Sequence, residues 1–335
     1  MRKTRALVAG DRLAVVAPAS AFDREQFDQG LEELRRLGFE PVYDDSVFAR
    51  HRYLAGGAEL RAAALIRAWS DQSIAGIIAV RGGYGSAQLL PLIDPALVRR
   101  AAKPLIGYSD ITTLLNFQTL TCGVVSFHGP MLDRRLGRGD AGYDRDTFVR
   151  ALCQTVPLGD LAPDGLEVVR PGDASGPLLG GTLTQLLATL GTPYAFDPPH
   201  GYVLLLDEVG ERPYRLDRMV TQARQAGLLA RANAVVIGEL PNCDEPGGDV
   251  TGRSVMAELF ADFPGPVIIG FPTGHTCGPT FTLPLGVTCR VVATGHPRLV
   301  IEESAVVQVP GLTTPVDDRG HPPSPLAGTS RPETT

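Results

Sequence analysis

The first 130 residues alternate short apolar runs with amphipathic segments, and this alternation restricts the possible fold more than any other feature. One predicted helix begins after Asp23, where Gln26 follows at the spacing of a capping box. Strands separated by helices of this length predict right-handed βαβ units and a parallel sheet, whose ligands bind at the carboxyl ends of the strands. The predicted strands are residues 13–17, 42–43, 76–80, 104–106 and 124–128.

The second half of the chain alternates less regularly and is richer in strand signals. The predicted elements are helices at residues 182–190 and 216–226, strands at 202–206, 234–237 and 267–269, and a hairpin of strands 288–292 and 298–301. We therefore expect an α/β protein with an N-terminal parallel-sheet domain of the flavodoxin or Rossmann kind and a C-terminal β-rich mixed α/β domain.

Length and composition set the expected domain boundaries. A chain of 335 residues exceeds what one core usually fills. We assign residues 1–135 to the N-terminal domain and residues 176–310 to the C-terminal domain. Residues 136–175 have weak periodicity and are expected to connect the domains. Residues 311–335, rich in Pro, Thr, Gly and Ser, are expected to be disordered.

Charge and cysteine usage exclude several classes of partner. A net charge of −6 gives no electrostatic reason to bind nucleic acid or an anionic membrane. No apolar run approaches the roughly 20 residues that span a bilayer, and the basic N-terminus lacks the long apolar stretch of a secretory signal. The five cysteines include no C-x-x-C pair and indicate reduced thiols in the cytoplasm, without a zinc site.

A serine lies in the turn between a predicted strand and a predicted helix. Residues 104–106 are apolar, Gly107-Tyr108-Ser109-Asp110 form a polar turn, and residues 111–115 begin an apolar helix. Such a turn lifts the serine Oγ clear of the sheet, near the positive end of the helix dipole. Serine nucleophiles are presented in this way in α/β hydrolases. This turn lacks their second glycine, so the motif alone only suggests a nucleophile.

A glycine-rich loop, Arg81-Gly82-Gly83-Tyr84-Gly85-Ser86, follows the predicted strand 76–80. Glycines there let the backbone approach a ligand and direct N–H groups at an anion. The spacing matches neither G-x-G-x-x-G nor G-K-[ST], which argues against nucleotide binding. We favour a wall of the serine pocket that donates an oxyanion N–H group. A purely structural turn is the other interpretation.

A serine nucleophile needs a base and an acid. Among six histidines, His275 follows strand 267–269 in a flexible loop and is the best candidate base, while His128 ends another strand and could line the same edge. Asp207 and Glu208 end an apolar strand, where a buried carboxylate would need a partner. Glu211 more simply pairs with the arginines that follow it.

These pieces in their order resemble the LD-carboxypeptidase family of serine peptidases, over most of residues 10–290. The resemblance rests on residues 10–11, 17–20, 81–85, 107–110, 128–131, 180–183, 190–194, 211–218, 274–275 and 283–286. Each match is weak, but their shared order and spacing are specific. The family includes murein tetrapeptide LD-carboxypeptidases and microcin C self-immunity peptidases.

The resemblance implies a Ser–His–Glu triad in the chain order Ser, Glu, His. Ser109 matches the nucleophile and His275 the base. Asp207 aligns with the family's glutamate, while Glu208 could serve after a local shift. Because strand alternation aims these two side chains at opposite faces, only one can meet His275, and we favour Asp207.

The resemblance also implies that the active site lies between the two domains. The other predicted site residues and partners complete this interpretation. Backbone N–H groups of Asp110 and of Gly82 or Gly83 would form the oxyanion hole. Arg81, Tyr84 and Thr182 are expected to contact the substrate, and Arg81 is expected to bind the substrate's carboxylate. Relatives often have asparagine at the Thr182 position. No metal or organic cofactor is expected, and the protein is expected to be a cytoplasmic homodimer.

The expected activity is hydrolysis of the amide between an L-centre and a terminal D-alanine of murein tetrapeptide, in wall recycling. One alternative is a self-immunity-type peptidase or amidase that cleaves a peptidyl-nucleotide, whose base could stack on an aromatic ring. The one tryptophan, Trp69, is expected in the core, which favours the murein peptide. A further alternative is a two-domain protein that binds a small ligand without chemistry.

Overall fold

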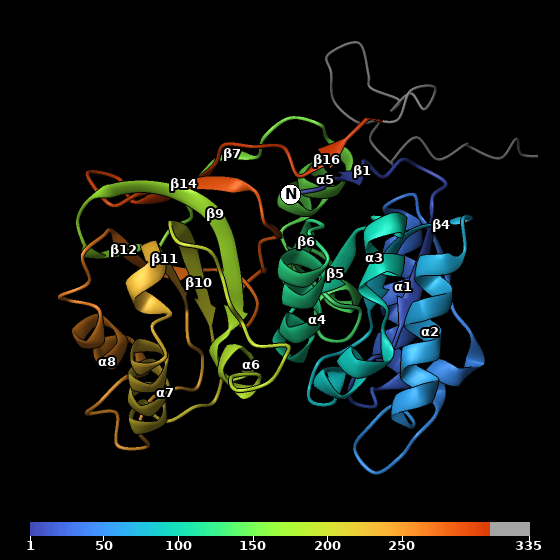
Figure 1. Ribbon diagram of the computed structural model, residues 1–335, viewed down its shortest axis with the longest axis horizontal. Helices are drawn as coiled ribbons and strands as arrows, with labels where there is room; N and C mark the ends of the chain where they lie inside the picture. The colour runs from blue at the N-terminus through green and yellow to red at the C-terminus, as the bar shows by residue number, and fades with distance from the viewer. Residues whose placement is uncertain (309–335) are drawn as a thin grey trace, which may run out of the picture.

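The structure of the protein is a computed structural model that describes residues 1–308. The predicted disordered tail at residues 311–335 therefore lies outside the described residues. Two sheets lie side by side, each with its own helices (Figure 1). A short parallel pair, β1 (Thr4–Arg5) and β16 (Val306–Val307), joins the two ends of the described chain.

The N-terminal sheet has six strands in the order β13-β6-β5-β4-β2-β3. Five of its strands are parallel and lie in the order β3-β2-β4-β5-β6. Numbered along the chain from β2, this order is 2-1-3-4-5, the order of flavodoxin-like sheets. The parallel flavodoxin-like sheet is thereby confirmed. The strands are β2 (Arg12–Val16), β3 (Glu40–Val42), β4 (Ile74–Ala79), β5 (Leu105–Gly107), β6 (Ser126–His128) and β13 (Leu283–Leu285).

Local signals account for the helices of this domain. The Asp23 side chain accepts a hydrogen bond from the Gln26 N–H and caps α1, and Asp94 caps α3 from the Ala96 N–H. The helices are α1 (Arg24–Arg36), α2 (Ala58–Ser70), α3 (Pro95–Ala101), α4 (Thr112–Asn116) and α5 (Arg145–Cys153). Short turns are η1 (Asp45–Phe48), η2 (Ser86–Leu92), η3 (Ser109–Ile111), η4 (Phe117–Thr121) and η5 (Leu136–Ala141).

The C-terminal sheet has eight strands in the order β7-β15-β14-β9-β10-β11-β12-β8. Its centre, β9 to β12, is parallel, whereas β14 and β15 form the predicted hairpin. The strands are β7 (Gly159–Leu161), β8 (Glu167–Arg170), β9 (Asp173–Thr182), β10 (Tyr202–Asp207), β11 (Ala232–Gly238), β12 (Val267–Phe271), β14 (Thr288–Val292) and β15 (Arg298–Ile301). The helices are α6 (Leu183–Ala188), α7 (Pro213–Gln225), η6 (Leu229–Arg231) and α8 (Gly252–Leu259).

Regular structure also occupies segments for which the sequence predicted none. The segment 136–175 contains η5, α5, β7, β8 and the start of β9. The glycines of β9 obscure its strand pattern in the sequence. They are needed because neighbouring backbone lies too close to allow a Cβ atom. A Cβ on Gly176 would lie 2.0 Å from the Gly201 carbonyl oxygen, and one on Gly180 would lie 2.1 Å from the Leu205 oxygen.

The core explains how the two sheets hold together. One continuous buried cluster includes the N-terminal sheet and one face of the C-terminal sheet, with Ile78, Ile106, Val203 and Leu283 as members. A second cluster fills the other face of the C-terminal sheet, beneath α6, α7 and α8. Because the first cluster crosses from one sheet to the other, the sheets pack directly against each other and their loops meet.

One strand brings the loops of the two sheets together. β13 comes from the C-terminal half but pairs antiparallel with β6, with Leu283 opposite His128. The loop before β13 therefore runs from the carboxyl end of β12 to the edge of the N-terminal sheet. This loop contains His275. Within residues 1–308, no helix has the length and apolarity needed to cross a membrane.

Candidate active site

Ser109 occupies a strained turn at the carboxyl end of β5. Its φ is +62°, a left-handed conformation that few non-glycine residues adopt and that often marks a functional site. The chain can turn this sharply because Gly107 has no side chain. A Cβ there would lie 2.8 Å from Cγ2 of Ile111. Ser109 then begins η3, so it lies among the free N–H groups of a helical turn.

The glycine-rich loop lies directly against this serine. A Cβ on Gly82 would be 2.8 Å from Ser109 Cβ, 3.0 Å from its Oγ and 3.2 Å from the Asp110 nitrogen. Only glycine therefore allows this close approach. Within residues 1–308, no hydrogen bond uses the backbone N–H of Gly82 or Gly83. Both groups are free to donate to a ligand beside the serine.

Buried polar side chains hold the glycine-rich loop. Asp110 is 1% exposed, and its carboxylate accepts a 2.8 Å hydrogen bond from the Ser86 N–H. Burial raises the pKa of Asp110, and the Ser86 hydrogen bonds partly offset this effect. Arg61, also buried, donates to the carbonyl oxygens of Pro18 and Gly85 at 2.6 and 2.8 Å. The Asp110 side chain is thus an anchor of the loop.

Asp207 binds His275 twice. Its Oδ2 accepts from Nδ1 of the imidazole at 2.8 Å, and its Oδ1 accepts from the His275 backbone N–H at 2.9 Å. Thr182 donates its hydroxyl to Oδ2 at 3.0 Å. Asp207 ends β10 and Thr182 ends the neighbouring β9, where the two residues are paired in register. The carboxylate is completely buried, so these three donors replace its water.

The two groups of this pair stabilise each other's charge. Burial raises the pKa of Asp207, but the charge and hydrogen bonds of His275 outweigh burial, so the pKa is lowered. Burial lowers the pKa of His275, but the charge and hydrogen bond of Asp207 outweigh it, so the pKa is raised. Because Nδ1 is bound to the carboxylate, Nε2 is the ring nitrogen left to exchange a proton.

Tyr108 connects the imidazole to the serine turn. Its ring, one residue before Ser109, packs edge to face against His275 with 5.0 Å between ring centroids. Within the described chain, no hydrogen bond joins the Ser109 hydroxyl to the His275 ring. Such bonds are often long without substrate and tighten when it binds.

Glu208 points to the opposite face of the strand and does not reach His275. Its Oε2 accepts from the N–H and the hydroxyl of Thr184 at 2.8 and 2.7 Å. These contacts hold the first turn of α6. The interpretation of Glu208 as the acid is corrected by this geometry, and the physical reason is the alternation of side chains along β10.

The expected substrate contacts have different surroundings. Thr182 is buried, and its hydroxyl proton is used by Asp207, so it contacts the acid instead of open space. Arg81 lies 3.4 Å from Asp133 and donates to the Ala21 carbonyl at 3.0 Å. Tyr84 is 49% exposed and packs edge-on against the exposed Tyr53. Of the three, Tyr84 is the most accessible.

Two buried residues near the pair were not assigned as site residues from the sequence. Arg135 is 6% exposed and donates to loop carbonyls on both sides of His275. His128 is completely buried, with Nε2 4.0 Å from Oδ2 of Asp207 and Nδ1 3.1 Å from the Thr273 hydroxyl. Only the position of His128 at a strand end signalled it, and Arg135 lies in a segment without periodicity.

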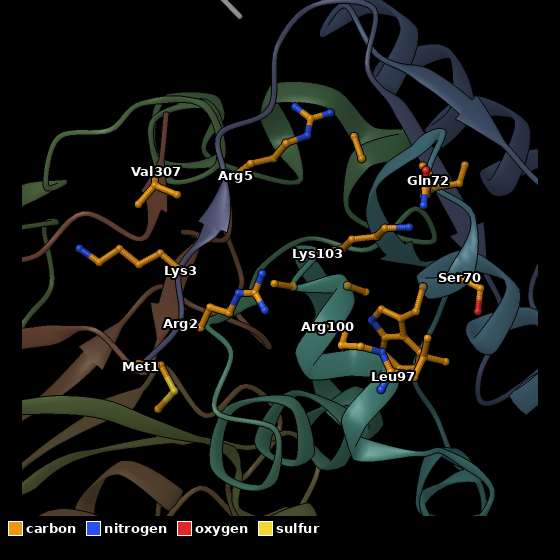
Figure 2. A pocket seen from close by; sticks show the side chains of 15 residues that line it. Met1, Arg2, Lys3, Arg5, Ser70, Gln72, Leu97, Arg100, Lys103 and Val307 are labelled. Atoms are coloured by element: carbon orange, nitrogen blue, oxygen red, sulfur yellow. The ribbon is translucent and has the colours of Figure 1, made fainter. Parts of the chain in front are cut away.

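A hollow of about 910 Å³ is lined by Arg5, Arg100 and Lys103 among others (Figure 2). Its lining includes Ile74 at the start of β4, so it lies at the amino end of the sheet, whereas Ser109 follows the carboxyl end of β5. Most of its basic side chains already have partners. Arg5 binds Asp11, Lys3 binds Glu303, and Lys103 donates to two backbone carbonyls. Trp69 borders this hollow but is only 2% exposed and belongs to the first core cluster. Its predicted place in the core is thereby confirmed. The hollow is separate from the serine site.

The fold and this arrangement of side chains are those of a serine hydrolase. The chain belongs to the LD-carboxypeptidase family: the model of its N-terminal domain matches residues 13–129, and that of its C-terminal domain matches residues 175–291. The protein is therefore a serine peptidase, and the resemblance found in the sequence is confirmed.

Curated relatives carry related names. A probable murein peptide carboxypeptidase of Bacillus subtilis is 32% identical over 289 residues, which cover 85% of this chain and 89% of the relative. The murein tetrapeptide carboxypeptidase of Pseudomonas aeruginosa is 32% identical over 271 residues, covering 79% and 88%. The microcin C7 self-immunity protein MccF of Escherichia coli is 25% identical and covers 85% and 91%.

Solved structures show the same fold. A muramoyltetrapeptide carboxypeptidase from Oxalobacter formigenes superposes with a TM-score of 0.75 at 27% identity, covering 86% of this chain and 97% of that one. MccF in complex with glutamyl sulfamoyl guanosine superposes with a TM-score of 0.81 at 21% identity, covering 92% and 100%. At that identity the likeness to MccF concerns the fold alone.

Proposed function

We propose that this protein is a serine LD-carboxypeptidase that hydrolyses the amide between an L-centre and a terminal D-alanine of murein tetrapeptide. The observation that carries the proposal is the buried Asp207–His275 pair, packed through Tyr108 against the strained Ser109 turn. We place the site between the proposed N-terminal domain, assigned from the sequence to residues 1–135, and the proposed C-terminal domain, which begins at residue 176. Ser109 comes from the first domain, and Asp207 and His275 come from the second.

In the acylation step, His275 is the general base. Its Nε2 takes the proton of the Ser109 hydroxyl while Oγ attacks the scissile carbonyl carbon. Asp207 keeps Nδ1 protonated and stabilises the imidazolium that forms. The imidazolium then gives its proton to the leaving amine of D-alanine as the C–N bond breaks, which leaves an ester on Ser109.

The negative oxygen of the tetrahedral intermediate needs N–H donors. The proposed donors are the backbone N–H groups of Asp110 and of Gly82 or Gly83, because Gly82 lies against both Ser109 Oγ and the Asp110 nitrogen. Loss of one such donor typically costs on the order of 10²–10³ in rate. Water, activated by His275, then attacks the ester and restores the free hydroxyl. These steps use groups that the protein itself supplies.

The names of the relatives support the choice of murein peptide. Two curated relatives at 32% identity are named for murein peptides, and so is a solved structure at 27%. A peptide with a free carboxylate needs a cation, and Arg81, beside the glycine-rich loop, is the proposed partner. Tyr84 is proposed to contact the peptide because it is exposed on the same loop. The proposed role is recycling of wall peptides.

The peptidyl-nucleotide alternative has less support. The one tryptophan of the chain is Trp69, buried at the opposite end of the sheet, so it cannot stack on a nucleotide base at Ser109. A cytoplasmic homodimer remains our proposal for location and assembly. The free thiols of the cysteines, Cys122 and Cys243 among them, support the location. Sedimentation of the purified protein tests the dimer.

The direct test incubates the full-length protein with murein tetrapeptide and measures free D-alanine. We expect release by the wild type and none by Ser109→Ala. A peptidyl-nucleotide is tested in parallel. Cleavage of the nucleotide conjugate without release of D-alanine would favour the self-immunity activity, and binding of tetrapeptide without any release would contradict the proposed chemistry.

A further inference from the structure

Arg135 uses every hydrogen-bond donor that it has. An arginine carries five N–H donors. Nη2 donates to the carbonyl oxygens of Gly274 and Thr276 at 2.9 and 3.0 Å, and Nη1 donates to those of Gly278 and Gly142 at 3.0 and 3.3 Å. Nε donates to the Tyr108 hydroxyl at 3.3 Å. No donor remains for a substrate, so Arg135 does not bind one.

The groups that accept hydrogen bonds from Arg135 lie both in the loop that carries His275 and in the turn that carries Ser109. Gly274 and Thr276 are the residues on either side of His275, and Tyr108 is the residue before Ser109. Arg135 itself follows β6 in the N-terminal domain. One guanidinium thus spans the base loop and the nucleophile turn, and these loops come from different domains. Its planar fork fixes directions as well as distances.

Among the described residues, this guanidinium forms no ion pair with a carboxylate. Within residues 1–308, its partners are four carbonyls and one hydroxyl, and none is a carboxylate. The positive charge opposes the effect of Asp207, because it lowers the pKa of His275. The other titratable or charged groups around His275 are Asp207, Glu208, His128 and Tyr108.

We propose that Arg135 is a positioning residue for His275. It fixes the loop that carries His275 against the turn that carries Ser109. It also supplies, beside the imidazole, a positive charge that has no carboxylate partner within residues 1–308. This role rests on the proposed function of His275 as the base. Geometry and charge are two separate contributions, so different substitutions separate them. Arg135→Lys keeps the charge and loses the fork, whereas Arg135→Gln loses both.

Two readouts test the proposal without the natural substrate. The first is the rate at which a fluorophosphonate labels Ser109, and the second is an NMR pH titration of the His275 ring. We expect both variants to be labelled about 10²-fold more slowly, because small misplacements have costs of this order. We expect the His275 titration to move to higher pH in Arg135→Gln and to stay near that of the wild type in Arg135→Lys.

A third variant tests the guanidinium directly. In Arg135→Ala, millimolar guanidinium should restore part of the labelling rate, whereas methylammonium should not. Arg99→Ala is the matched control, since Arg99 also donates to two backbone carbonyls, those of Cys122 and Thr121, but far from the site. It should show neither the loss nor the rescue.

The outcomes distinguish the two proposals. An unchanged His275 titration in Arg135→Gln, or a loss of labelling that matches the fraction of unfolded protein, overturns the role of Arg135. A wild type that is labelled but releases no D-alanine contradicts the proposed substrate, while both readouts on Arg135 keep their meaning. A wild type that the reagent does not label overturns the role of His275 and of Arg135 together.

Discussion

Asp207 holds His275 by both its ring and its backbone, at 2.8 and 2.9 Å. The first bond orients the imidazole, and the second fixes the loop that carries it. Substitution with asparagine would place an amide where the carboxylate accepts from Nδ1. We predict that Asp207→Asn lowers kcat for D-alanine release by about 10⁴, because the imidazole then takes the wrong tautomer.

Glu208→Gln is the matched control for that substitution. Glu208 is the next residue along β10 but binds Thr184. Its loss should change kcat by less than about tenfold while lowering the thermal midpoint, since a charged hydrogen bond contributes about 1.5–3 kcal/mol. The reverse pattern, with Glu208 essential and Asp207 dispensable, would contradict the assignment of the acid.

Thr182 acts on the acid and not on the substrate in this geometry. Thr182→Val removes the 3.0 Å hydrogen bond to Asp207 at nearly constant shape. A hydrogen bond to a charged group is worth about 1.5–3 kcal/mol, so we predict a roughly ten- to hundredfold lower kcat with little change in KM. Steady-state kinetics separate the two constants. A rise in KM alone would restore Thr182 as a substrate contact.

The activity should depend on pH through His275. The base works as the neutral imidazole, and burial lowers the pKa of His275 while Asp207 raises it by more. We therefore predict that kcat/KM rises with pH to a plateau, with its midpoint above the ordinary histidine value of about 6.5. A pH–rate profile between about pH 5 and 9 measures this. A midpoint at or below the ordinary value would contradict the pairing with Asp207.

Gly82 is predicted to tolerate no side chain. The Cβ of Gly82→Ala would meet Ser109 Cβ at 2.8 Å and its Oγ at 3.0 Å. We predict a loss of about 10² or more in kcat, the size of losing one oxyanion donor, because the loop or the serine must shift. Gly57→Ala is the control, since its Cβ would meet only Glu59 Oε2, at an ordinary 3.7 Å. Equal losses in both variants would argue against a special contact.

His128 should make the protein sensitive to acid. Burial lowers the pKa of His128 from 6.5 to about 4. The unfolded chain therefore binds a proton at a pH where the native protein does not, and stability is lost as pH falls from about 6.5 towards 4. The loss amounts to about 3 kcal/mol at most. Urea unfolding at several pH values should show a shallower dependence in His128→Phe, whereas substitution of the exposed His296 by Gln should leave the slope unchanged.

Local sequence signals predicted many of the elements and the parallel sheet. Asp23 and Asp94 cap α1 and α3, and the hairpin has the predicted bounds. Capping, periodicity and turn residues act over a few neighbouring positions, so they can be read without knowledge of the fold. The family motifs likewise placed Ser109 and His275 on loops at strand ends.

Long-range packing decided what remained. Asp207 and Glu208 are adjacent, chemically alike and both buried, and only the packing on each face of β10 determined which of them meets His275. The pairing of β13 with β6 brings the loop that carries His275 to the Ser109 turn. This pairing joins residues that are far apart in the sequence, such as Leu283 and His128. Arg135 acquired its acceptors from both domains. Such contacts depend on which distant surfaces become buried together, and no short window of sequence contains that information.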